Sequence, residues 1–93
     1  MRKTRFDLDA TQLMRQWPES QPGTLACYLA LREIAALCET TDFYTTIGEI
    51  GSRSLLSETG TRRALDLMQR RSLIDKRRTG RGLAIQLFKV AKV

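Results

Sequence analysis

The segment from Ser57 to Gly82, SETGTRRALDLMQRRSLIDKRRTGRG, limits the possible folds of this chain more than any other stretch. Its first half predicts a short helix that buries one side, because apolar or small residues recur there at helical spacing. The residues of this inward stripe occur at i, i+3, i+4 and i+7: Thr61, Ala64, Leu65 and Met68. Ser57 is a residue type that commonly caps a helix N-terminus, so the helix is expected to start there.

The second half of the segment predicts a β-hairpin with a basic tip. Leu73–Arg77 and Leu83–Phe88 are the expected strands, and the sequence RTGRG lies between them as the turn. In the second strand every other residue is a large apolar one, so one side of it should pack inward. A helix with a basic face is thus expected beside a basic hairpin.

Charge is unevenly distributed along the 93 residues. The net charge is +6, but residues 1–52 carry five Lys/Arg and seven Asp/Glu, whereas residues 53–93 carry eleven and three. Such an imbalance favours a polyanionic partner for one face of the molecule. A basic surface that is merely solvated is the alternative on charge alone.

The N-terminal part, residues 1–23, is expected to be a basic arm (residues 1–5) and a short helix. Asp9 could cap this helix and Pro18 would stop it. Pro18–Gly23 is then a connector. Residues 24–93 are long enough for one small domain with a modest core.

The longest helix is expected over Leu25–Glu39, with Thr24 as its N-cap. Its apolar residues form a main inward stripe: Cys27, Ala30, Leu31, Ile34, Leu37 and Cys38. A second group (Leu25, Leu29 and Ala36) lies on roughly the opposite side. That side requires cover from the N-terminal helix, through residues such as Leu13 and Trp17, or from another subunit. The expected oligomer is a homodimer.

Between the two long helices we expect two short elements and a turn. Thr40–Thr46 is rich in β-branched and aromatic residues, which favours a strand. A brief helix should follow, with Ile47 and Ile50 inward, and Ser52–Ser57 is the expected turn.

The residue inventory argues against several classes of protein. Histidine is absent and no CxxC pair occurs, so neither a metal site nor a histidine-assisted nucleophile is expected. No cofactor, small-molecule ligand or enzymatic activity is predicted. Cys27 and Cys38 would lie about 16 Å apart on one helix, which excludes an internal disulfide and predicts buried thiols. No apolar run reaches membrane length and no signal peptide is evident, so no membrane association and a cytoplasmic, nucleoid-associated location are expected.

The helix over Ser57–Arg71 is the candidate site. With its apolar stripe inward, Thr59, Arg63, Asp66 and Arg70 point outward, and Glu58 and Arg62 lie on one flank. In a DNA major groove, the base-reading residues would be those near the N-terminus, namely Thr59, Arg62 and Arg63. The residues expected to contact phosphates or the minor groove are Ser57, Arg70, Arg71, Lys76, Arg77, Arg78 and Arg81. Glu58 should pair with Arg62, and Asp66 should orient Arg62 and Arg70.

Residues 25–90 resemble the winged helix-turn-helix family of bacterial regulators, in the broad MarR/GntR-like sense, and related phage and plasmid modules. The resemblance is carried by Ser57, by Arg62-Arg63-Ala64-Leu65, and by Leu73-Ile74 before the basic hairpin. It implies an α+β, mostly helical fold with a three-helix core and a C-terminal wing, in which Ser57–Arg71 is the recognition helix and Arg77–Gly82 the wing. Gly60, Thr61 and Ser72 depart from the family pattern, and the Ser52–Ser57 loop looks longer than usual.

The resulting expectation is a sequence-specific double-stranded DNA-binding protein. It would be a transcriptional regulator that represses by occupying its operator, as repressors of mobile elements do. The alternative is a protein-docking or assembly module of a plasmid or phage replication complex or another nucleoprotein complex. RNA binding is a weaker third option, because no aromatic stacking surface accompanies the basic residues.

Overall fold

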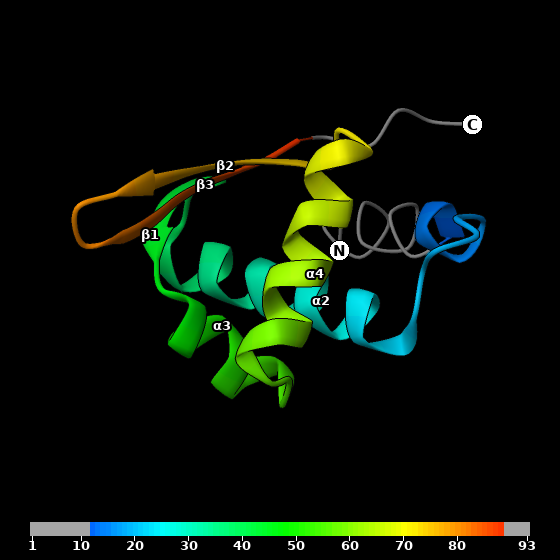
Figure 1. Ribbon diagram of the computed structural model, residues 1–93. Helices are drawn as coiled ribbons and strands as arrows, with labels where there is room; N and C mark the ends of the chain where they lie inside the picture. The colour runs from blue at the N-terminus through cyan, green and yellow to red at the C-terminus, as the bar shows by residue number, and fades with distance from the viewer. Residues whose placement is uncertain (1–11, 89–93) are drawn as a thin grey trace.

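The computed structural model describes residues 12–88 and shows an α+β fold, as expected (Figure 1). Residues 12–15 are helical, and the later elements are α2 (Pro22–Cys38), β1 (Asp42–Thr45), α3 (Ile47–Ser54), α4 (Glu58–Arg70), β2 (Ile74–Thr79) and β3 (Gly82–Leu87). The strands form an antiparallel sheet in the order β1-β3-β2. The predicted basic arm at residues 1–5 and the Asp9 cap lie outside the described residues.

Helix α2 begins three residues earlier than expected. Its N-cap is Gln21 rather than Thr24, and Pro22 occupies the first helical position. Proline is favoured there because its fixed φ suits a helix and its missing N–H would have had no intrahelical partner. Thr24 is therefore inside the helix, where its Oγ1 accepts a hydrogen bond from the Gln21 N–H (3.4 Å). The connector expected over Pro18–Gly23 is correspondingly shorter.

The inward side of α2 was predicted correctly in its centre and wrongly at its end. The buried residues of this helix are Thr24, Cys27, Tyr28, Ala30, Leu31, Ile34 and Ala35. Leu37 and Cys38 are instead exposed, with Leu37 at 67%. Leu37 lies at the edge of the buried arc, and Cys38 is the last helical residue, after which Glu39 adopts a left-handed conformation and turns the chain towards β1.

Helix α3 is longer than predicted and the following turn is shorter. Thr46 caps it by accepting a hydrogen bond from the Glu49 N–H (3.0 Å), and the helix continues to Ser54. Only Leu55–Ser57 separates it from α4, instead of the expected Ser52–Ser57. Gly51 makes this tight turn possible, because a Cβ there would lie 3.0 Å from the Leu56 carbonyl oxygen.

Helix α4 has the predicted cap and the predicted inward stripe. Ser57 Oγ accepts a hydrogen bond from the Gly60 N–H (3.0 Å). The four stripe residues are all buried, and so is Leu67, which the stripe did not include. Leu67 shares a hollow with Glu19 and Gln21, so the segment that precedes α2 covers this flank of α4. The helix ends at Arg70 with Arg71 as its C-cap, and the next residue, Ser72, is a non-glycine residue with φ of +61°.

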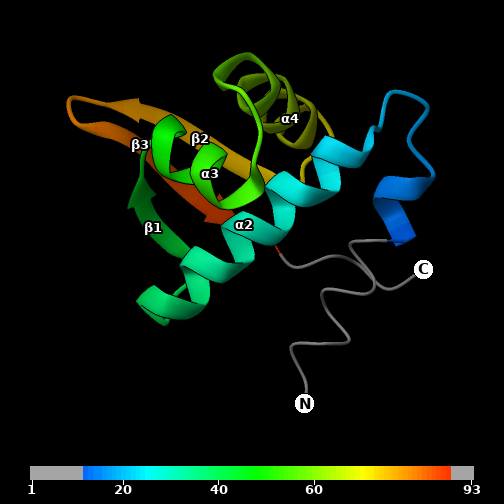
Figure 2. The same cartoon turned by 90° about the horizontal axis from the view of Figure 1, so that it is seen from below.

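The hairpin strands reach closer to the tip than expected. Thr79 pairs with Gly82, so only Gly80 and Arg81 form the turn. Gly82 has φ of +151°, and a Cβ there would lie 2.4 Å from the Thr45 carbonyl oxygen. Glycine is thus required where β3 meets β1. Figures 1 and 2 show the hairpin extending from the sheet beyond the helices, which pack against the sheet's other end.

The N-terminal segment completes the core on one side of α2. Met14 and Trp17 are buried, and Leu13 and Leu25 are partly buried against the hydrophobic core. Leu29, from the same predicted group, remains 46% exposed. Within residues 12–88, no helix has the length and apolar character needed to cross a membrane.

Candidate nucleic-acid interface

The outward face of α4 carries the predicted polar residues. The exposed side chains are Glu58, Thr59, Arg62, Arg63, Asp66, Gln69 and Arg70. Burial of the Thr61–Met68 stripe against α2 and α3 directs them away from the core. Figure 1 shows α4 crossing α2, with its N-terminal end next to α3.

Two arginines of this face have no acidic partner among the residues that the structure describes, Arg63 and Arg70. Arg62 differs, because the predicted Glu58 pair is present: its Nη2 and Nε lie 2.8 and 3.2 Å from Glu58 Oε2. A phosphate or a guanine edge would therefore find Arg63 and Arg70 unneutralised and Arg62 in competition with Glu58.

The role predicted for Asp66 was wrong. Its Oδ1 lies 2.8 Å from Lys76 Nζ on β2, so this carboxylate pairs with Lys76 instead of with Arg62 or Arg70. The spacing of four residues would allow a pair along the helix, but Lys76 approaches from the neighbouring strand and takes this carboxylate instead. Lys76, predicted as a phosphate contact, is consequently engaged within the protein.

Strand alternation divides the basic residues of the hairpin between two faces. Lys76 pairs with Ile85 and Arg78 with Leu83, so both lie on the face that looks towards the helices. Arg77 lies on the opposite face, together with Asp75, whose Oδ2 is 3.9 Å from Arg77 Nε. Arg77 therefore does not share a face with Lys76 and Arg78.

The turn of the hairpin lies beside the start of α3. Arg81 and Gly82 line a groove together with Glu58 and the first residues of α3. Arg78 and Arg81 have no ion pair within residues 12–88. Arg81 is the basic residue that lines this groove, whereas Arg63 and Arg70 of α4 line a second hollow together with Glu19 and Asp66.

Arg71, another predicted phosphate contact, is held at the far end of α4. Its Nη2 lies 2.6 Å from Glu19 Oε1, and its Cζ lies 5.5 Å from the centre of the Trp17 ring. Hydrogen bonds from its own backbone N–H and from Arg71 lower the pKa of the Glu19 carboxyl. This arginine fastens the segment before α2 to α4, so a phosphate would have to displace Glu19 from it.

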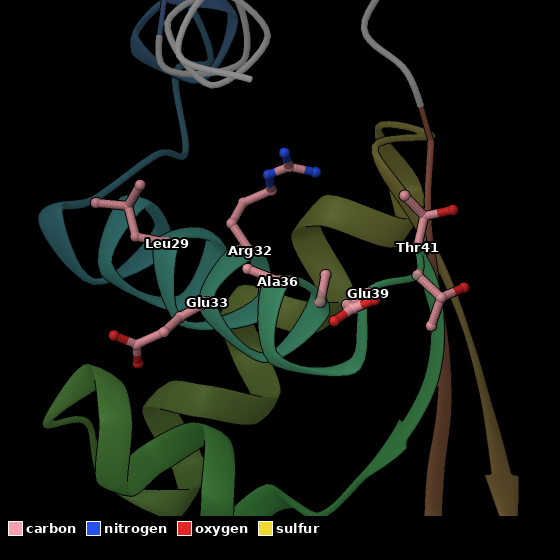
Figure 3. A pocket seen from close by; sticks show the side chains of 8 residues that line it. Leu29, Arg32, Glu33, Ala36, Glu39 and Thr41 are labelled. Carbon is pink, nitrogen blue, oxygen red and sulfur yellow. The ribbon is translucent and has the colours of Figure 1, made fainter. Parts of the chain in front are cut away.

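A second surface lies on the outward face of α2. A hollow of about 540 Å³ is lined there by Leu29, Arg32, Glu33, Ala35, Ala36, Glu39, Thr40 and Thr41. Figure 3 shows Leu29 and Ala36 along the helix, with Arg32 and Glu33 projecting to opposite sides. Glu33 is already paired, since its Oε1 lies 2.6 Å from Arg53 Nη1, and this hydrogen bond raises the pKa of Arg53.

One exposed aromatic residue was missed from the sequence. Tyr44 is 78% exposed on the outer face of the sheet. It pairs with Ala84 of β3, and Arg77 of β2 pairs with the same residue, so Tyr44 and Arg77 lie on one face. One exposed aromatic side chain thus lies on the same face of the sheet as Arg77. Strict alternation in Asp42–Thr45, with Phe43 and Thr45 inward, is the signal that could have found it.

No group of three potential metal ligands occurs in the described part of the chain. No protein-family model and no curated protein matches the sequence.

Proposed function

We propose that this chain is a winged helix-turn-helix protein that binds double-stranded DNA and regulates transcription, acting as a repressor by occupying its operator. One observation carries the proposal: arginines without an acidic partner in residues 12–88 lie both on the exposed face of α4 (Arg63 and Arg70) and on the hairpin that packs against this helix (Arg78 and Arg81). A double helix presents a continuous array of phosphates, and a pair of cationic elements of different shape can bind it along the major groove and at its edge.

In this proposal α3, the Leu55–Ser57 turn and α4 form the helix-turn-helix. Arg63 and Thr59 occupy the N-terminal half of α4, where side chains of a recognition helix reach base edges. Arg63 is suited to guanine, because its guanidinium can donate two parallel hydrogen bonds to O6 and N7. Arg62 would join it by exchanging Glu58 for a base or phosphate.

The remaining cations would contact the backbone. Arg70 lies two turns further along α4 and would contact phosphate, and Arg78 and Arg81 would do so from the hairpin. These contacts carry little sequence information but set the register of the protein on the duplex. Their combined effect would be a strong dependence of affinity on salt.

The test is a fluorescence-anisotropy titration of a labelled duplex, after selection of bound sequences from a random DNA pool. Arg63→Glu should weaken binding to the selected duplex by at least about tenfold, because one base contact contributes roughly 1–3 kcal/mol and reversal adds repulsion. Arg15→Glu is the matched control: it makes the same charge change at an exposed position on the N-terminal segment.

Equal losses in the two variants would mean that only overall charge matters, and sequence-specific reading by α4 would be refuted. Absence of duplex binding by the unaltered protein at low salt would refute the whole proposal. If binding occurs, the log–log plot of affinity against salt should fall by about 0.9 per phosphate contacted.

A second candidate function, protein docking within a nucleoprotein assembly, is favoured by the exposed leucines of α2. Leu29 and Leu37 are large apolar side chains at the solvent-facing surface of a helix. A homodimer through this face would also serve the first function, because two copies can read two half-sites. Leu29→Glu tests both: loss of self-association or partner binding with intact duplex binding would assign α2 to protein contacts.

A further inference from the structure

Two side chains on consecutive turns of α4 contact the same residue of β2. Asp66 Oδ1 lies 2.8 Å from Lys76 Nζ, and Gln69 Oε1 accepts a hydrogen bond from the Lys76 backbone N–H (2.8 Å). Asp66 and Gln69 lie on the same flank of α4, three residues apart. Lys76 is therefore held at its side chain and at its backbone by one helix.

The backbone contact involves the free edge of the sheet. The order β1-β3-β2 makes β2 an edge strand. The Phe88 N–H donates to the Leu73 carbonyl, and bonded residues alternate along an antiparallel pair, so the Lys76 N–H points away from β3. It would face solvent without Gln69. The glutamine thus satisfies an edge amide and joins the sheet to the helix.

The side-chain contact also changes the charge of the candidate interface. Asp66 lies on the outward side of α4, between Arg62 and Arg70 in sequence, where a lone carboxylate would repel phosphate. Lys76 neutralises it from the neighbouring strand. The pair removes one charge of each sign from the surface, while Arg63, Arg70, Arg78 and Arg81 have no ion pair within residues 12–88.

We propose that Asp66 and Gln69 are positioning residues: they hold Lys76, and with it the β2–β3 hairpin, at a fixed angle to α4, so that helix and hairpin present their arginines to one duplex. Lys76 is then a fastening point rather than a phosphate contact. The inference rests on the proposed function for its consequence, but the fastening itself is a property of the free protein.

The fastening is tested first without DNA, by amide hydrogen exchange measured by NMR. In the unaltered protein the Lys76 amide should exchange slowly although it lies on a sheet edge. Gln69→Ala should remove this protection, and Gln69→Glu, which keeps Oε1, should retain it. The Arg77 amide points towards β3 and is the internal control. Equal Lys76 protection in Gln69→Ala and the unaltered protein would refute the fastening.

The consequence is tested by a double-mutant cycle on duplex affinity. In the unaltered background Arg81→Ala should lower the salt slope by about 0.9, the value for one phosphate contact. In the Gln69→Ala background the same substitution should change the slope little, because the hairpin is no longer directed at the duplex. Gln69→Ala adds no charge, so it cannot act by attraction or repulsion of phosphate.

The outcomes separate the two proposals. The positioning role is supported if the Lys76 amide exchanges rapidly in Gln69→Ala and if the effects of Gln69→Ala and Arg81→Ala on the salt slope are not additive. Additive effects of Gln69→Ala and Arg81→Ala would refute it while leaving DNA binding intact. No duplex binding by any variant would refute the proposed function, and the exchange result would still decide whether the fastening exists.

Discussion

The outward faces of α4 and α2 use their charged residues in opposite ways. On α4 and the adjoining hairpin, Arg63, Arg70, Arg78 and Arg81 have no acidic partner within residues 12–88. On α2, Glu33 is bound to Arg53 of α3, and the surface beside it includes the exposed apolar side chains of Leu29 and Leu37. One face retains unpaired positive charge, and the other combines a satisfied ion pair with apolar side chains.

This difference indicates which kind of partner each face suits. Unpaired cations on an exposed surface repel one another, and a polyanion relieves that repulsion. An apolar surface instead gains from the removal of water by another apolar surface. The α4–hairpin face therefore suits nucleic acid and the α2 face suits protein, and substitutions can alter one face while leaving the other unchanged.

The largest expected effect comes from Gly82→Ala, which disturbs the sheet at the base of the hairpin turn, where β3 meets β1. A Cβ would lie 2.4 Å from the Thr45 carbonyl oxygen, on a residue with φ of +151°. Backbone strain of about 1–3 kcal/mol adds to overpacking of similar size, so the free energy of unfolding should fall by roughly 2–6 kcal/mol in urea denaturation.

Gly80→Ala is the control in the same turn, because a Cβ there meets nothing within 4 Å. It should leave stability unchanged or raise it by up to about 1 kcal/mol through the unfolded state. Equal losses in the two variants would show that the close approach of β3 to β1 is not what requires glycine at residue 82.

The sequence predicted elements better than it predicted contacts between them. The stripe from Thr61 to Met68 and the Ser57 cap were correct because both depend on neighbours within one helix. By contrast, Lys76 was predicted to contact phosphate and Asp66 to orient arginines, but the two residues pair with each other. Their pairing depends on the angle between a helix and a strand, which no local sequence pattern specifies. Pro22 could have corrected the start of α2, because proline at a first helical position is a local signal.

Burial at helix ends was the other source of error, and Cys38 illustrates it. Helical periodicity places Cys38 with Cys27, but periodicity does not say where the covering elements stop. Cys27 is fully buried and Cys38 is exposed. The same helix thus carries one thiol in the core and one at the surface.

These two thiols give the next largest effect, which concerns the inward side of α2. Burial raises the pKa of the Cys27 thiol from its ordinary 9.0 to about 12. The unfolded state therefore ionises first, and stability that is complete below pH 9 should be lost as pH rises towards 12, by up to about 1.4 kcal/mol per pH unit. Urea denaturation across this range should show a smaller alkaline loss in Cys27→Ala than in the unaltered protein.

Cys38→Ala is the matched control and should retain the full alkaline loss. Alkylation at pH 8 should modify Cys38 alone in the folded protein and both thiols in denaturant. Rapid alkylation of Cys27 in the native state would contradict its burial.

Ser57→Ala should have a smaller effect, confined to the start of α4. It removes the acceptor for the Gly60 N–H and should cost about 1 kcal/mol of unfolding free energy, a typical value for an N-cap. Ser52→Ala in α3 is the control, because its exposed side chain makes no hydrogen bond within the described residues. A loss in Ser52→Ala equal to that in Ser57→Ala would refute the capping role.

The smallest expected effect on stability comes from neutralising one carboxylate on each face, which allows the two faces to be compared directly. Glu58→Gln removes the partner of Arg62 and should lower stability by no more than about 0.5 kcal/mol, as for other exposed helix pairs. Glu33→Gln removes one of the two carboxylates that pair with Arg53, the other being Glu49, and makes the same change in net charge. In duplex titrations Glu58→Gln should tighten binding several-fold more than Glu33→Gln. The reason is that Glu58→Gln releases Arg62 and removes a negative charge beside the duplex, whereas Glu33 lies on the outward face of α2, away from the proposed duplex. Equal changes in affinity would mean that duplex DNA responds only to net charge, and the distinction between the α4 and α2 faces would not hold.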